Sequence, residues 1–87
     1  MKTTQMMNDK GRPVANHFIH YDEKTGERKL QSYNSIIVKI HNGQVTLGKD
    51  WNYSPTTSKF RNQFLGETTK ETQAKLDSGE YLYDENL

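Results

Sequence analysis

The sequence of 87 residues predicts an α+β fold, in which an antiparallel sheet of four to five strands carries two short helices on one face. Three features predict it: strand-like segments in the first half, an Asn-Gly dipeptide between two alternating segments, and two successive helix-start signals in the second half. The expected order is β-β-β-β-α-α-β. The length fits one domain, which we place at residues 14–83, with a frayed end at residues 84–87.

The N-terminal segment, residues 1–13, is polar, holds all three methionines of the chain and ends in Gly11-Arg12-Pro13. We expect it to form a flexible arm. It lacks the apolar stretch of a signal peptide, and no segment of the chain has the 18 or so consecutive apolar residues of a membrane span. The expected location is therefore the cytoplasm, without membrane contact.

Two hairpins are expected. Residues 14–21 alternate like a strand, residues 22–27 have turn chemistry, and residues 28–33 return as the partner. In the second hairpin, residues 35–41 and 44–48 flank Asn42-Gly43, a dipeptide that tolerates the positive φ angles of a type I′ turn. This two-residue loop fixes the register and gathers five apolar side chains on one core face: Ile36, Val38, Ile40, Val45 and Leu47.

Two short helices follow. Ser54 is a suitable N-cap with Pro55 in the first helical position, and Gly66 suits the left-handed residue that ends the helix. Its apolar stripe is Thr57, Phe60 and Phe64, with Leu65 on the flank. A second helix is expected over residues 69–77, because Thr68 and Glu71 match a capping box. Residues 80–83 then form a short edge strand.

The composition limits both stability and chemistry. Leu, Ile, Val and Phe together make up 16 of the 87 residues, so the core is small and self-association into a homodimer would help to hold it. The chain has no cysteine, which excludes disulfides, thiolate metal sites and cysteine nucleophiles.

The net charge of +1 conceals an asymmetry: residues 1–66 hold 10 Lys or Arg against 5 Asp or Glu, whereas residues 67–87 hold 2 against 6. A basic body favours an acidic partner, although dispersed solubilising charges explain the same counts.

No catalytic or metal-binding pattern stands out. His17 and His20 lie three apart on a predicted strand, so they point to opposite faces and cannot share a metal ion without a bulge. The glycines are scattered singly at turns, and no Gly-x-Ser-x-Gly elbow occurs. We therefore expect a protein that is not an enzyme and uses neither a metal nor a cofactor.

The segment from Leu47 to Leu65 is the candidate binding region. Hydroxyl, aromatic and basic side chains crowd around the predicted start of the first helix, where free N–H groups favour an anion. Tryptophan and arginine are also frequent anchors of interfaces. The structural alternative is that Ser54 only caps, the aromatic rings wedge under the helix and the charges face water. The candidate partner-binding residues are Lys49, Trp51, Tyr53, Thr56, Lys59, Arg61 and Asn62.

Residues 33–82, about half the chain, resemble small uncharacterised proteins of phages and plasmids from low-GC Gram-positive bacteria. The pattern is Leu-Gly-x-Asp-Trp-x-Tyr-Ser-x-Thr-Thr-x-Lys-(x)4-Phe-Leu, followed by Ser-Gly-Glu-Tyr. It is carried by Leu47, Gly48, Asp50, Trp51, Tyr53, Ser54, Thr56, Thr57, Lys59, Phe64, Leu65, Gly79 and Tyr81. The resemblance brings no established activity and no catalytic residue. It implies a mobile-element setting, in which small proteins without catalytic machinery often antagonise host defence, anti-CRISPR proteins included.

The leading hypothesis is a phage-type binding protein that inhibits a host nuclease complex, such as a CRISPR effector, through the candidate binding region. The rival hypothesis is a small accessory protein that binds nucleic acid directly with the same basic and aromatic residues. The third hypothesis is that the protein is a structural or assembly subunit. Affinity that falls steeply with added salt would favour direct phosphate contacts over a protein interface.

Overall fold

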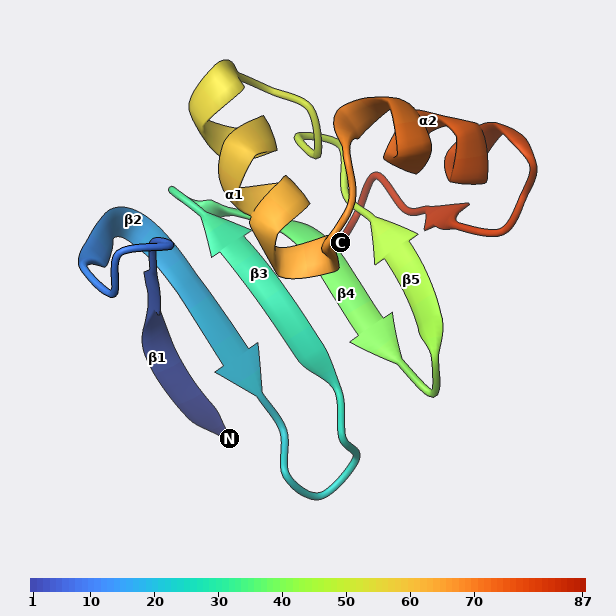
Figure 1. Cartoon of the computed structure of the whole chain (residues 1–87). Coiled ribbons are helices and arrows are strands. Elements are labelled where there is room, and N and C mark those ends of the chain that lie inside the picture. Colours follow the sequence, from blue (N-terminus) through green and yellow to red (C-terminus); the bar gives the residue numbers. More distant parts are fainter.

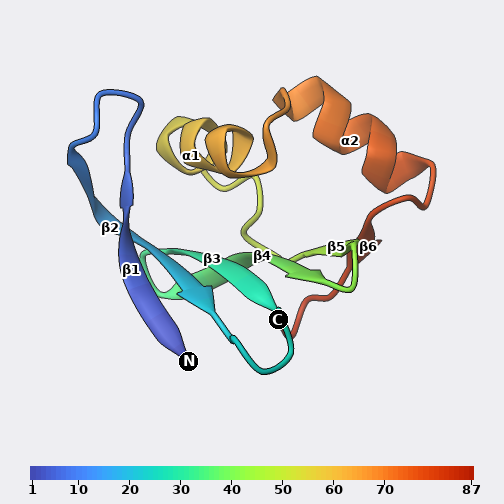
Figure 2. The ribbon, with the colours of Figure 1, turned by 60° about the horizontal axis from the view of Figure 1, so that its bottom comes forward.

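The computed structural model describes residues 1–87 and shows an α+β fold with a six-stranded sheet (Figure 1). The strands are ordered β1-β2-β3-β4-β5-β6 in space as in sequence. Both helices lie on the same face of the sheet (Figure 2), as the sequence predicted. The sheet has one or two strands more than expected. The elements are β1 Lys2–Met7, β2 Pro13–Tyr21, β3 Arg28–Ser32, β4 Ser35–His41, β5 Gln44–Leu47, α1 Pro55–Leu65, α2 Thr69–Asp77 and β6 Leu82–Tyr83.

The N-terminal segment is not a flexible arm. Its residues Lys2–Met7 form β1, which pairs antiparallel with β2, and Met6 is only 3% exposed in the core. Asn8 closes the connecting turn by accepting hydrogen bonds from the backbone N–H groups of Lys10 and Arg12 at 2.9 and 3.0 Å. An edge strand that buries a single side chain has almost no alternation of apolar and polar residues. The polar sequence of residues 2–7 therefore did not predict a strand.

The Asn42-Gly43 hairpin was predicted correctly. Asn42 and Gly43 have φ angles of 51° and 77°. Ile40 lies opposite Val45 and Val38 lies opposite Leu47, in the expected register. Local turn chemistry therefore sets the alignment of β4 and β5.

A β-bulge in β4 corrects one core assignment. Leu30 pairs with Val38 but the next residue, Gln31, pairs with Ile36, so Ile37 is an extra residue in β4. The extra residue shifts the alternation by one position. As a result Ile37 is fully buried, whereas Ile36, predicted to lie on the core face, is half-buried.

The last strand makes the sheet mixed. β6 pairs with β5 in parallel, with Thr46 opposite Leu82 and Leu47 opposite Tyr83. The two helices form the crossover connection that a parallel neighbour requires. Residues 84–87 have no regular secondary structure, but the Asp84 N–H donates to the Leu47 carbonyl at 2.9 Å.

Both helices begin and end where the sequence predicted. Ser54 caps α1, Pro55 is its first residue, and Gly66 ends it with φ 71°. Thr68 and Glu71 form the predicted capping box of α2. α1 lies across β3 (Figure 1) and buries Thr57 and Phe60 of its predicted stripe, while Phe64 is only half-buried.

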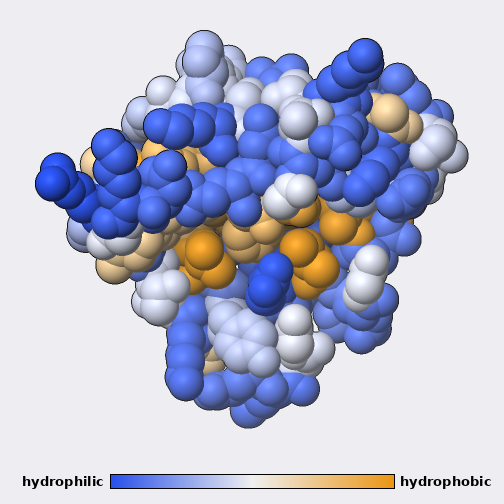
Figure 3. Space-filling model, in the orientation of Figure 1, coloured by the Kyte–Doolittle hydropathy of each residue, from blue (hydrophilic) through white to orange (hydrophobic).

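The core lies between the sheet and the helices and consists of Met6, Leu30, Ile37, Val38, Val45, Leu47, Trp51, Phe60 and Tyr81. Half-buried apolar side chains at its margin are Val14, Ile19, Ile40, Phe64, Leu65 and Leu76. On the face seen in Figure 3, apolar surface forms a band below the helices, and the outer surfaces are mostly hydrophilic.

Candidate binding face

A buried chain of hydroxyl groups fixes the start of α1 to the sheet. Thr57 lies 3.0 Å from Ser32 on β3, and Ser32 lies 3.0 Å from Nε2 of His17 on β2. Nδ1 of His17 faces the Ala15 carbonyl at 2.8 Å, and a carbonyl only accepts, so Nδ1 carries a hydrogen. In the neutral ring, Nε2 accepts from Ser32, which in turn accepts from Thr57. These contacts hold the N-terminus of α1 against the β3–β4 turn.

The structure divides the seven predicted partner-binding residues. Lys49, Tyr53, Thr56 and Lys59 are exposed, and Tyr53 is 76% exposed although it is a large aromatic residue. Asn62 is half-buried. The other two, Trp51 and Arg61, are buried and therefore do not belong to an exposed face.

Arg61 was predicted to bind a partner, but in the structure it is fully buried and contacts other parts of the protein. Its guanidinium carbon lies 4.9 Å from the centre of the Trp51 ring, and Nη1 donates to the Trp51 carbonyl. Nη2 donates to Asn62 Oδ1 at 2.9 Å and to Thr69 Oγ1 at 2.7 Å. One side chain thus joins the loop before α1, α1 itself and the start of α2.

Burial lowers the pKa of the Arg61 guanidinium, and the nearby charge of Glu67 partly offsets that effect. A guanidinium remains charged in proteins, because its ordinary pKa lies far above neutral pH. The hydrogen bonds of Nη1 and Nη2 and the Trp51 ring offset part of the cost of burying this charge, whereas Nε is buried without a hydrogen-bond partner.

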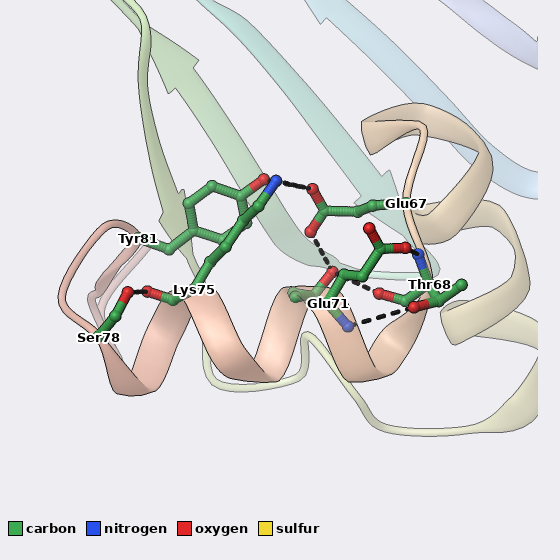
Figure 4. Close-up of polar contacts among 7 residues, drawn as sticks. Glu67, Thr68, Glu71, Lys75, Ser78 and Tyr81 are labelled. Carbon is green, nitrogen blue, oxygen red and sulfur yellow. Dashed lines mark hydrogen bonds and ion pairs between the residues drawn. The ribbon is translucent and has the colours of Figure 1, made fainter.

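Glu67 is the carboxylate on the other side of this junction. Its side chain is only 5% exposed and accepts from Thr72, from Lys75 Nζ at 2.9 Å and from the Tyr81 hydroxyl at 2.6 Å (Figure 4). Burial alone would raise the pKa of Glu67, but these hydrogen bonds outweigh it and hold the pKa below its usual value. The network ties α2 and the approach to β6 to the α1–α2 turn.

A pocket of about 420 Å³ opens beside the start of α1. It is lined by residues 32–35, Ile37, Asp50, Tyr53 and Thr57. Ser32, Ile37 and Thr57 are buried and form its floor, while Tyr33 and Tyr53 are exposed at its rim. We call this feature the tyrosine pocket.

The tyrosine pocket has one charged lining residue, Asp50. Oδ2 of its carboxylate accepts from Ser35 Oγ at 2.6 Å. No other hydrogen bond and no ion pair reaches this carboxylate, so it keeps free acceptor capacity beside the pocket.

Tyr33 is held in a conformation that bulky residues rarely adopt. It occupies the two-residue turn between Ser32 and Ser35 with φ 55°, where glycine or asparagine is usual. Its N–H donates to the Asn16 carbonyl at 2.7 Å, and its ring packs edge-on against His17 at 5.6 Å between centroids. The turn therefore presents a half-exposed tyrosine at the pocket.

A second hollow of about 530 Å³ lies between α1 and the β1–β2 edge. Gln63 of α1 crosses it to donate to the Met7 carbonyl at 2.6 Å, and the Arg28 guanidinium lies 5.3 Å from the Phe64 ring centre. The first contact joins α1 to β1, and the second joins α1 to β3.

Sequence reasoning missed Tyr33, Asp50 and Ser35 as candidate site residues. Tyr33 lies in the β3–β4 turn and Ser35 begins β4, whereas Asp50 and Tyr53 lie in the loop before α1. The pairing of β4 with β5 brings the two segments together. The resemblance pattern contained Asp50, but nothing local linked it to Tyr33.

The fold and this face define a small α+β domain with an open pocket beside a helix N-terminus. No helix of the structure is long and apolar enough to cross a membrane. The chain belongs to a family of unknown function, DUF8033, whose model matches residues 1–80. Comparisons with curated proteins and with solved structures gave no match.

Proposed function

We propose that this protein is a non-enzymatic, phage-type binding protein that acts in the host cytoplasm and inhibits a host defence nuclease complex, as anti-CRISPR proteins do. The observation that carries the binding role is the pair of exposed tyrosines at one pocket, with Tyr53 76% and Tyr33 50% exposed. Tyrosine is enriched at the energetic centres of interfaces because its ring buries a large area. The choice of target rests on the resemblance to phage and plasmid proteins.

The environment of the serine–histidine pair supports binding rather than catalysis. Ser32 and His17 are both buried, and Ser32 also accepts from Thr57. The hydroxyl is thus engaged on both sides inside the core. These contacts of the Ser32 hydroxyl hold together the floor of the tyrosine pocket.

A nucleic-acid-binding accessory protein is the second candidate function. One short segment exposes two basic side chains and one aromatic side chain, those of Lys49, Lys59 and Tyr53. Proteins that bind single-stranded nucleic acid use such a combination. Arg61 and Trp51 are buried, so two of the side chains expected to contact phosphates and bases are not accessible. The acidic Asp50 at the pocket also disfavours phosphate there. We therefore favour a protein partner.

The test is a defence-interference assay combined with a pull-down. The full chain is expressed in bacteria that carry a nuclease-based defence, and phage plating efficiency is measured. A tagged copy is recovered with and without nuclease treatment of the lysate. We expect plating to rise at least tenfold, and a component of the nuclease complex to be recovered after nuclease treatment.

The matched variant is Tyr53→Ala, which removes an exposed side chain and so should melt like the parent. We expect it to lose both effects, whereas Glu85→Gln on the exposed tail should keep them. Unchanged plating with the parent chain would contradict the inhibitor role. Recovery that disappears after nuclease treatment would favour the nucleic-acid alternative.

A further inference from the structure

We infer that the tyrosine pocket is a recognition site for a cationic side chain, specifically the guanidinium of an arginine that a partner protein presents. The inference rests on the proposed binding function and specifies the chemistry of the partner. It is carried by the unpaired acceptor capacity of Asp50, the two rim tyrosines and the size of the pocket.

The charge of the pocket selects a cation. Asp50 is its one charged lining residue, and Ser35 is the single donor to that carboxylate. A partly enclosed carboxylate without a counter-ion favours a positive group beside it. An arginine side chain supplies parallel N–H donors that match a carboxylate geometrically.

The aromatic rim suits the same group. Tyr33 and Tyr53 both line the pocket, and neither phenol hydroxyl has a hydrogen-bond partner in the protein. A guanidinium stacks on aromatic faces and is attracted to them electrostatically. The volume of about 420 Å³ lies within the usual range of small-ligand sites.

The left-handed conformation of Tyr33 supports a role for this particular side chain. A bulky residue at φ 55° is strained by comparison with glycine, and such strain clusters at functional sites. The strained turn holds the ring at the pocket rim instead of letting it fold away. The β3–β4 turn thereby preorganises one wall of the site.

Phosphate is the disfavoured occupant. It would approach Asp50, a like charge, and no lysine or arginine lines the pocket. Proteins that bind nucleic acid carry Lys and Arg where they contact phosphates. A nuclease complex therefore offers the side chain that this pocket accepts, which connects the site to the proposed target class.

The experiment is an NMR titration of the full chain with N-acetyl-arginine methylamide. N-acetyl-citrulline methylamide, a neutral molecule of nearly the same shape, is the matched probe. We expect the arginine probe to shift the amide signals of residues 33–35 and 50–53 in a saturable way. The citrulline probe should bind at least tenfold more weakly.

Two charge-removing variants separate the site from general electrostatics. Asp50→Asn keeps an acceptor for Ser35 and should weaken the arginine probe at least tenfold. Asp77→Asn removes the same charge from the exposed end of α2, outside the pocket, and should leave binding within twofold. Melting curves of both variants should match that of the parent, which checks that the variants are folded.

Equal binding of the two probes, or equal effects of Asp50→Asn and Asp77→Asn, would overturn the inference. So would an oligothymidine strand that shifts the same signals and binds Asp50→Asn more tightly than the parent. If the arginine probe fails while the parent still blocks the defence nuclease, the proposed function stands without this site. If the probe binds as expected and the nuclease is not blocked, the site stands and the proposed target fails.

Discussion

The Arg61 guanidinium stacks over the Trp51 ring at 4.9 Å and also donates to the Trp51 backbone carbonyl. The pair places in the core two residues that look like binding residues in sequence. Lys59, two residues earlier on α1, is exposed instead. Of the two basic residues of α1, Arg61 therefore supports the fold, whereas Lys59 lies at the surface. Mutating each one should affect stability differently.

Arg61→Ala should lower the free energy of unfolding by about 3 kcal/mol or more, because it leaves the Trp51 carbonyl without its donor and removes hydrogen bonds to Asn62 and Thr69 together with the packing on the Trp51 ring. Lys59→Glu should change it by less than about 0.5 kcal/mol, since the side chain is exposed. Urea denaturation of both variants measures the difference. Equal midpoints would mean that Arg61 does not hold the loop against the helices.

Local sequence signals predicted the elements whose structure is decided locally. The Asn42-Gly43 turn set the register of its hairpin, and Ser54 and Thr68 marked both helix starts. Non-local packing decided the rest. Nothing near Arg61 in sequence shows that Trp51 and Thr69 surround it, so its charge was taken as a sign of exposure. The register after Gln31 likewise depends on a bulge in β4, which period-2 reasoning cannot detect.

The candidate site was predictable only in part. Tyr53 and Lys59 were named from the sequence and are exposed. The tyrosine pocket exists because the β3–β4 turn meets the loop before α1, and alternation patterns carry no information about that contact. The unusual φ of Tyr33 is also invisible in a sequence that has no glycine at that turn.

The second prediction concerns Gly48, which directly follows β5 at the point where the chain leaves the sheet. A Cβ atom at this position would lie 2.3 Å from the Ile36 carbonyl oxygen, a backbone atom that cannot rotate away. Gly48→Ala should therefore destabilise the fold by about 1–3 kcal/mol through overpacking. Gly26→Ala is a useful comparison, since a Cβ there meets nothing within 4 Å and only its φ of 76° is unfavourable. Thermal denaturation that ranks Gly26→Ala as clearly the more damaging change would contradict the close approach.

The two phenylalanines of α1 should differ in their contributions. Phe60 is buried in the core, where its ring lies 5.0 Å from that of His17, whereas Phe64 is half-buried at the margin. Phe60→Ala should destabilise by about 3–5 kcal/mol, and Phe64→Ala by clearly less because part of its ring is already in water. Melting temperatures of both variants test the order. A reversed order would place the second phenylalanine, not the first, at the centre of the core.

Acid should weaken the fold through Glu67. Its hydrogen bonds from Thr72, Tyr81 and Lys75 hold its folded-state pKa below the usual 4.5, so its contribution to stability is complete above about pH 4.5 and is lost as the pH falls through the lowered value. Glu67→Gln removes the charge and should cost about 1–3 kcal/mol at pH 7, because the three donors lose a charged acceptor. The difference in stability between parent and variant should then be smaller at pH 3 than at pH 7, because the stabilisation by the parent's carboxylate is progressively lost below its ordinary pKa.

The measurement is urea denaturation of the parent and Glu67→Gln at both pH values, with Glu85→Gln as the control for loss of an exposed carboxylate. The control should follow the parent at pH 7, because Glu85 lies exposed on the C-terminal tail. A constant gap between parent and Glu67→Gln from pH 7 to pH 3 would show that the variant acts through packing alone. A narrowing gap would instead assign the loss in acid to the carboxylate that joins the α1–α2 turn to Tyr81, the residue that leads the chain into β6.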